Sequence, residues 1–257
     1  MNDLTISLVQ SNLHWENVEA NLKQFDQQLS SLKGKTDLII LPEMFTTGFS
    51  MNPEKLAENM KGQTVSWMKN KASELGAAIC GSLIIEENSR YFNRLIFMHP
   101  EGHFFTYDKR HLFTLGKENE HYTPGINRLV VSLKGWKIMP LICYDLRFPV
   151  WSRNDRAYDL LVYVANWPEP RRNAWKSLLI GRAIENQAYT VGVNRVGKDG
   201  TGANYTGDSC LIDYSGEVLF SASKSENIFT TTISKSDQQS FRSKLEFLAD
   251  RDNFEIK

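Results

Sequence analysis

The chain has 257 residues, with 30 basic and 30 acidic side chains and therefore no formal net charge. Its hydrophobic fraction of 41% and aromatic fraction of 11% can form a sizeable core, which argues against disorder. The balanced charge argues against a dedicated nucleic-acid binder, because such proteins carry a positive patch. We expect one domain over residues 1–257, with the C-terminal ~20 residues as a tail.

The N-terminal segment and the cysteines indicate where the protein resides. Residues 1–10 (MNDLTISLVQ) lack the basic start and the continuous apolar run of a signal peptide. The longest apolar stretches are strand-sized, far short of the roughly 20 residues that a membrane-spanning helix needs. Cys80, Cys143 and Cys210 are three widely spaced cysteines, which favours reduced thiols over a disulfide framework. The sequence therefore predicts a cytoplasmic protein with no membrane partner.

The first part of the chain predicts strands in alternation with helices. Residues 4–9 alternate between apolar and polar side chains, as a half-buried strand does. Apolar side chains recur at helical spacing over residues 18–32. The continuous apolar run 38–41 is typical of a strand buried on both faces, and a second helix is expected over 65–75.

Strands are denser further along the chain, and a longer helix interrupts them. We expect strands at 77–85, 94–98, 103–107, 129–133, 137–142, 160–164, 190–194, 210–212, 218–220 and 228–233, and a helix at 174–186. Such a mixture indicates an α/β protein with two sheets and helices outside them, a layered α-β-β-α arrangement.

Three reactive residues share one local context. Glu43, Lys109 and Cys143 each sit just past a predicted strand, in LIILPE, FFTYDK and IMPLIC. Ligand-binding groups gather at the carboxyl ends of strands in open α/β sheets. We therefore expect these three side chains to meet in one catalytic site.

Each of the three residues has a chemical role that suits its type. A turn from strand into helix would place the Cys143 sulfur near helix amides, which favour the reactive thiolate. Glu43, partly desolvated, would have a raised pKa and accept the thiol proton. Lys109 would stabilise the oxyanion of a tetrahedral intermediate. The alternatives are a buried structural cysteine and two solvated surface charges.

Other candidate chemistries have weaker support. His111 invites a Cys-His protease interpretation, but the sequence offers it no orienting partner. The glycines between residues 197 and 207 lack the spacing of a phosphate-binding loop. We find no histidine and cysteine spacing typical of a structural zinc site, and we expect no metal.

The sequence resembles the nitrilase superfamily, the carbon–nitrogen hydrolases that use a Glu-Lys-Cys trio. The resemblance runs from Leu4 to about Ile233 and is carried by LPEMFTTGF, YDKRHLF, CYDLRFP, ANWP and RAIENQAY. It implies a four-layer α-β-β-α sandwich of the nitrilase-like type, usually assembled as a homodimer. It also implies a small-molecule amide substrate and covalent chemistry on the cysteine without a cofactor.

The resemblance extends to further site residues. A second glutamate precedes a Pro-Gly turn in this family, and that position falls on Glu118, with Glu120 as the alternative. The family oxyanion hole combines the lysine, here Lys109, with the backbone N–H after the cysteine, here that of Tyr144.

Two longer segments, ICYDLRFPVWSRN and VANWPEPR, resemble the omega-amidase branch, which deamidates 2-oxo acids such as 2-oxoglutaramate. A substrate carboxylate requires a cation, and Arg171 and Arg147 are the candidates, with Trp167 covering the carbon chain. The alternatives are a loop-closing surface role for Arg171 and an ion pair with Asp145 for Arg147.

Three other functions remain open. The chain could be another hydrolase of this superfamily, acting on N-carbamoyl compounds or nitriles, or an amidase-like acyltransferase. It could also be a catalytically silent binding protein on the same scaffold. We would expect such a protein to have lost one of the three catalytic residues, and all three are present.

Overall fold

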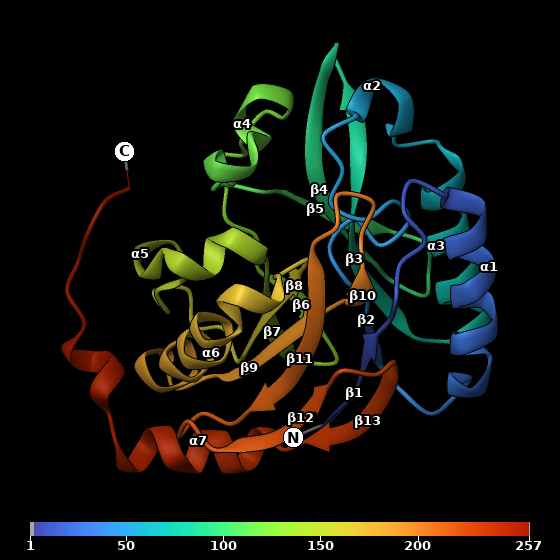
Figure 1. The fold of residues 1–257 in the computed structure, drawn as a ribbon. Coiled ribbons are helices and arrows are strands. Elements are labelled where there is room, and N and C mark those ends of the chain that lie inside the picture. Colours follow the sequence, from blue (N-terminus) through green and yellow to red (C-terminus); the bar gives the residue numbers. More distant parts are fainter. Residues whose placement is uncertain (1–2, 257) are drawn as a thin grey trace.

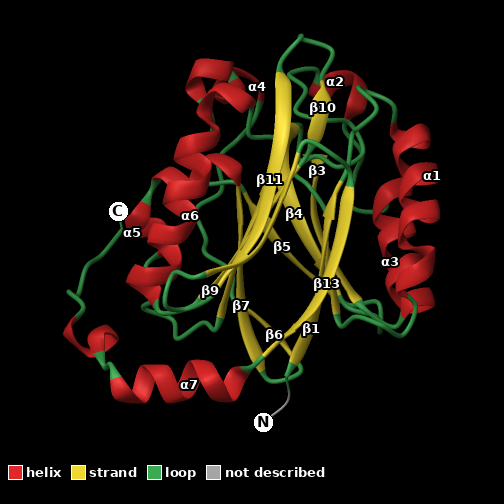
Figure 2. Cartoon of the chain, turned by 60° about the horizontal axis from the view of Figure 1, so that its bottom comes forward, coloured by secondary structure: helices red, strands yellow, loops and turns green. Residues whose placement is uncertain are grey.

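The computed structural model describes residues 3–256, which form a mixed α/β fold in four layers. Helices α1 (Val18–Leu29) and α3 (Gln63–Leu75) cover the outside of one sheet. Helix α6 (Arg172–Asn186) and the short α5 (Pro149–Ser152) lie on the outside of the other (Figure 2). The predicted α-β-β-α sandwich is thus confirmed. No helix within the described part is long and apolar enough to cross a membrane.

The first sheet brings the two ends of the fold together. Within residues 3–256 it has six strands in the order β13-β1-β2-β3-β4-β5, with β1, β2 and β3 parallel and the other pairs antiparallel. The late strand β13 pairs with the first strand β1 (Figure 1). The strands are β1 (Leu4–Gln10), β2 (Leu38–Ile40), β3 (Ala78–Glu87), β4 (Arg90–Met98), β5 (Phe104–Asp108) and β13 (Asn227–Ile233).

The second sheet has a parallel centre formed by β7, β8 and β9. Across the described residues its order is β10-β11-β9-β8-β7-β6, and β12 also pairs with β11. The strands are β6 (Val131–Leu133), β7 (Trp136–Ile142), β8 (Leu160–Ala165), β9 (Tyr189–Asn194), β10 (Val196–Lys198), β11 (Asn204–Ile212) and β12 (Val218–Ser223). The carboxyl ends of β7 and β8 lead directly into the site described below.

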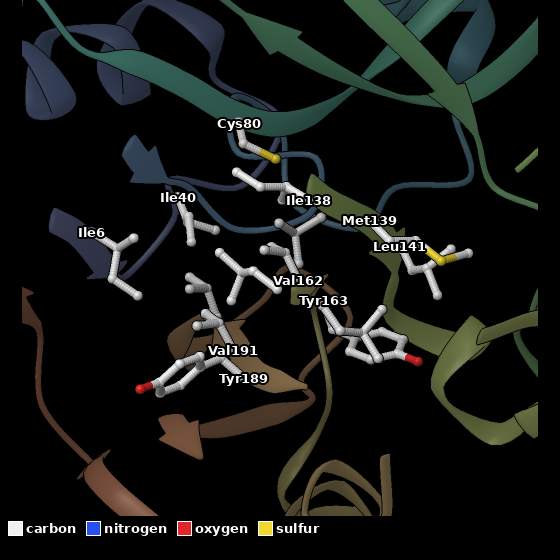
Figure 3. Close-up of a cluster of buried hydrophobic side chains, with 14 of the residues drawn as sticks. Ile6, Ile40, Cys80, Ile138, Met139, Leu141, Val162, Tyr163, Tyr189 and Val191 are labelled. Carbon is white, nitrogen blue, oxygen red and sulfur yellow. The ribbon is translucent and has the colours of Figure 1, made fainter. Parts of the chain in front are cut away.

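The largest apolar cluster of the described residues fills the space between the two sheets and continues to helix α6 on the outside of the second sheet (Figure 3). Ile6 and Ile40 of the first sheet face Val162 and Val191 of the second. Because successive side chains of a strand point to opposite faces, Ile39 instead packs against α1 and α3. Strand β2 is therefore buried on both faces, as its continuous apolar run predicts.

Three further helices complete the fold: α2 (Pro53–Leu56), α4 (Glu118–His121) and α7 (Lys235–Lys244). Helix α7 packs onto the second sheet through buried Gln238, whose Nε2 donates to the backbone oxygen of Asp159 at 2.8 Å. Arg242 adds a hydrogen bond from its Nη2 to the backbone oxygen of Tyr158 at 2.9 Å. Part of the C-terminal segment is therefore joined to the body of the fold.

The hairpin of β3 and β4 is longer than predicted. Expected strands at 77–85 and 94–98 extend to Glu87 and begin at Arg90, and a two-residue turn of Asn88 and Ser89 joins them. Both turn residues have positive φ, 52° and 57°, as such tight hairpin turns require. The polar residues near the turn hid the pairing in the sequence pattern. The extension places Asn93 inside β4, which matters for the site.

Candidate active site

Three strand ends bring Glu43, Lys109 and Cys143 together. The residues follow β2, β5 and β7, and only 0%, 1% and 9% of their surfaces are exposed. The Lys109 Nζ donates to the Glu43 Oε1 at 2.8 Å. The charges are therefore buried and paired rather than solvated, and the three side chains share one site as predicted from their positions after strands.

Cys143 lies at a sharp turn that exposes its sulfur to a cavity. It begins a 3-10 helix over Cys143–Arg147, directly after β7, and its φ of 44° is in the left-handed region. Asp145 fixes this turn, because its Oδ2 accepts a hydrogen bond from the Ile142 N–H at 3.1 Å. The predicted passage from strand to helix is thus observed, and the strained backbone directs the side chain inward.

The Cys143 thiol is not a stabilised thiolate in the free protein, contrary to our expectation. Burial, followed by the negative charge of Glu43, raises the pKa of the Cys143 thiol well above its ordinary value, against the opposing effect of Lys109. The resting group is a thiol, so a thiolate requires transfer of its proton to a base alongside.

Lys109 lies between two carboxylates. Its Nζ contacts Glu43 Oε1 at 2.8 Å and the two oxygens of Glu118 at 3.0 and 2.9 Å. Burial alone would lower the pKa of Lys109, but the charges of Glu118 and Glu43 outweigh it and raise that pKa. The ammonium group therefore stays protonated, and its three contacts fix it between the two carboxylates.

The geometry distinguishes Glu118 from Glu120. Glu118 is fully buried, and its Oε2 accepts the Phe113 N–H at 2.6 Å in addition to the Lys109 contacts. Burial raises the pKa of Glu118, and Lys109 opposes that rise. Glu120 is exposed, and its carboxylate lies 3.8 Å from the exposed Lys117. Glu118 is therefore the second glutamate of the site.

Two asparagines that sequence analysis did not single out complete the polar network. Asn93 Nδ2 donates to Glu43 Oε1 at 2.8 Å and to Glu118 Oε1 at 3.2 Å. The Asn166 N–H donates to Glu43 Oε2 at 2.8 Å, and its Nδ2 donates to the Glu43 backbone oxygen at 2.6 Å. Two features of the sequence could have indicated them. Asn93 is a polar residue inside the apolar segment YFNRLIF, and Asn166 is the first polar residue after the strand LLVYVA.

A cavity of about 480 Å³ opens onto Cys143 and Lys109. Tyr144, Trp167, Arg147 and Arg171 line it, together with Phe113, the loop residues Asp199, Thr201, Gly202 and Ala203, and Asn204 and Tyr205 at the start of β11. Trp167 is 3% exposed, and its Nε1 donates to the Arg171 backbone oxygen at 2.8 Å. The structure thus brings every residue predicted for substrate contact to one cavity.

The two cavity arginines lie over aromatic rings. The Arg147 guanidinium lies 5.0 Å from the centre of the Trp167 ring, and that of Arg171 lies 5.0 Å from the Phe113 ring. Within residues 3–256, neither arginine forms an ion pair with a carboxylate. Both guanidinium groups therefore keep donors free for an anionic ligand.

Asp145 is occupied by other partners, so its suggested pairing with Arg147 is wrong. Its oxygens accept the Tyr107 hydroxyl at 2.7 Å and lie 2.8 Å from His111 Nδ1. His111 thus has the carboxylate partner that the sequence did not reveal. However, its ring stacks on Phe148 at 3.7 Å and is not among the side chains that line the cavity, so the Cys-His protease interpretation gains no support.

Comparison with known proteins identifies the family. The family model described as carbon-nitrogen hydrolase matches residues 5–243. The chain belongs to the carbon–nitrogen hydrolase family. This hydrolase is 45% identical to "Omega-amidase YafV" of Escherichia coli strain K12 over 100% of both chains. It is 34% identical to "2-oxoglutaramate amidase" of Bacillus subtilis strain 168, over 89% of this chain and 90% of that protein.

A solved structure is similar over the entire chain. XC1258 from Xanthomonas campestris, a CN-hydrolase superfamily protein with an arsenic adduct in its active site, has a TM-score of 0.97 and 44% identity. The similarity covers 100% of both chains. The hydrolase is therefore an enzyme of carbon–nitrogen bond hydrolysis with the nitrilase-superfamily fold.

Iodoacetamide should label Cys143 well before Cys80 and Cys210. Cys143 lines the cavity, whereas Cys80 and Cys210 are not among the residues that line it. Peptide mapping by mass spectrometry after partial labelling measures the order. Equal labelling of all three thiols would contradict this assignment.

Replacing Asn93 with alanine should lower kcat about tenfold to hundredfold, because each lost hydrogen bond to a charged group costs about 1.5–3 kcal/mol. Steady-state kinetics measure the effect. Exposed Asn127, replaced in the same way, serves as the matched control and should keep full activity. Unchanged kcat in Asn93→Ala would show that the two carboxylates do not need this donor.

Proposed function

We propose that this hydrolase removes the terminal amide of small dicarboxylic monoamides, similar to 2-oxoglutaramate, and releases ammonia through a cysteine thioester. The observation that carries the proposal is the pair of arginines without ion-pair partners in the described chain, in the same cavity as Cys143 and Lys109. The relatives named omega-amidase and 2-oxoglutaramate amidase support the same substrate class.

The first half of the proposed reaction forms the thioester. Glu43 takes the proton of Cys143, and the thiolate attacks the amide carbon. The ammonium group of Lys109 and the backbone N–H of Tyr144 hold the resulting oxyanion. Glu43 then passes the proton to the nitrogen, and ammonia leaves. The raised pKa of the Cys143 thiol supports this order, because the nucleophile has to be generated next to its base.

The second half releases the acid. The same Glu43 carboxylate activates a water molecule, which attacks the thioester carbonyl and restores the thiol. Glu118 and Asn93 keep Glu43 and Lys109 in position throughout, because Asn93 donates to Glu43 and Glu118 accepts from Lys109. The cysteine supplies the covalent step, so the scheme uses no cofactor.

The far carboxylate of the substrate is assigned to Arg171. Its guanidinium can bind a carboxylate through two parallel hydrogen bonds, which a lysine cannot do. Trp167, whose indole is tied to the Arg171 backbone at 2.8 Å, would cover the carbon chain and exclude water. Arg147 on the Trp167 ring is the second cation and raises the positive potential of the cavity.

We further propose that the enzyme is a cytoplasmic homodimer. All three cysteines are free, which suits a reducing compartment. Val150 of α5, Ile184 of α6 and Phe254 are exposed by 53%, 52% and 39%, and an apolar surface of this kind favours contact with a second copy.

Substitutions of the three catalytic residues should affect different steps of the reaction. Cys143→Ala should form no acyl-enzyme, and Glu43→Gln should lose both acylation and deacylation. Lys109→Ala should lower kcat by at least about a hundredfold, the usual cost of one oxyanion donor. Ammonia-release kinetics and intact-mass detection of the thioester measure these steps. Near wild-type hydrolysis by Glu43→Gln would reject the mechanism.

Substrates with a carboxylate should react far faster than uncharged ones. We expect 2-oxoglutaramate or succinamate to release ammonia well ahead of propionamide, N-carbamoyl compounds and simple nitriles. Arg171→Lys should lower kcat/KM for the charged amides while leaving iodoacetamide labelling of Cys143 unchanged. The matched variant Arg147→Lys should have the smaller effect, because Arg147 is the more exposed of the two.

Equal turnover of charged and uncharged amides by the unmodified enzyme would reject the carboxylate-binding role and leave the amidase chemistry intact. Trapping with hydroxylamine in the same assay separates hydrolysis from acyl transfer.

A further inference from the structure

The turn between β4 and β5 brings two imidazoles and a carboxylate together. His99 and His103 pair across the hairpin, where the His99 N–H donates to the His103 oxygen at 2.9 Å, and Glu101 lies between them. One ligating atom from each of the three residues lies within 4.8 Å of the other two. We expected no metal site from the sequence. These three side chains come together only because the chain reverses its direction at Gly102, which has a φ of 87°.

His99 is the anchored member of the group. It is 6% exposed, and its Nε2 has no hydrogen-bond partner among residues 3–256. Its ring stacks against that of His103 at 4.2 Å and against the edges of apolar rings. A buried imidazole whose nitrogen has no hydrogen-bond partner is available to bind a metal ion.

We propose that His99, Glu101 and His103 bind a divalent cation such as Zn²⁺ or Ni²⁺. Imidazole nitrogens with a carboxylate oxygen are a donor set that these ions accept. Ligand atoms of a tetrahedral zinc site, with bonds of about 2.0–2.1 Å, are about 3.3 Å apart. Because the two imidazole rings are stacked with their planes 16° apart, their nitrogen lone pairs do not converge. His103 therefore has to leave the stack, and the group has to contract around the ion. The side chains of His103 and Glu101 are 57% and 69% exposed and so are free to move towards His99.

The ion would link residues at the turn of the β4–β5 hairpin, whose opposite end carries part of the active site. Asn93 lies on β4, Lys109 follows β5, and the Lys109 N–H donates to the Asn93 oxygen at 3.0 Å. None of the three ligand residues lines the Cys143 cavity. We therefore expect the ion to stabilise the fold rather than to take part in the reaction, and the proposal does not depend on the substrate.

Titration calorimetry with ZnCl₂ and NiCl₂ tests the site. Cys143 is itself a metal-binding thiol, so both the intact enzyme and Cys143→Ala are titrated. We expect one ion per chain at the turn in both. His103→Ala and Glu101→Gln should weaken binding at least about tenfold. Loss of a residue that only hydrogen-bonds to a metal ligand already lowers metal affinity by about that much. His14→Ala, which removes another exposed histidine, is the matched control and should bind as the intact enzyme does.

Thermal unfolding supplies an independent measurement that does not require activity. Because an ion that binds the folded state stabilises it, Zn²⁺ should raise the Tm of the intact enzyme and of His14→Ala, but not that of His103→Ala. Equal affinity in His103→Ala and His14→Ala would overturn the proposal. Binding that disappears in Cys143→Ala would also overturn it, because the ion would then belong to the catalytic cavity.

Discussion

A buried ammonium group between two buried carboxylates is the interaction on which the site depends. Lys109 contacts Glu43 and Glu118, and all three side chains are withdrawn from water. Removing such charges from water costs several kcal/mol per ion, and good geometry with additional hydrogen bonds is needed to offset that cost. Asn93, the Phe113 N–H and the Asn166 N–H supply those bonds. The removal of any one partner would leave a charge uncompensated.

The same network sets the state of the nucleophile. Two carboxylates and one ammonium surround a buried thiol and leave one net negative charge. The local field therefore does not favour a further negative charge on the sulfur. Burial is the main cause of the raised pKa of the Cys143 thiol, and the negative charge of Glu43 adds to it, although the residue opens a short helix. Reactivity then comes from a base within reach and from donors that act on the oxyanion, rather than from a preformed thiolate.

The two sheets and the loops contribute different parts of the site. Strand ends of both sheets supply the reactive groups, because β2 and β5 belong to the first sheet and β7 to the second. Loops supply much of the cavity wall, including the segment around Trp167 and the loop from Asp199 to Ala203 that precedes β11. The rigid core between the sheets therefore maintains the chemistry, while the loops are free to select the substrate.

The sequence by itself determined the layers, most of the strands and the positions of Glu43, Lys109 and Cys143. Apolar runs and strand ends are local patterns, and three reactive residues after three strands are visible without coordinates. The positions where strands end were predicted less reliably, because β3 and β4 continue to the polar turn at Asn88 and Ser89.

Only the tertiary structure decided which groups face one another. It selected Glu118 over Glu120 by burial, added Asn93 and Asn166, and separated Arg147 from Asp145. It also reversed the expected pKa shift of Cys143 and assembled the His99, Glu101 and His103 group. Burial, charge pairing and contacts across strands depend on residues distant in the chain, so no local pattern could specify them.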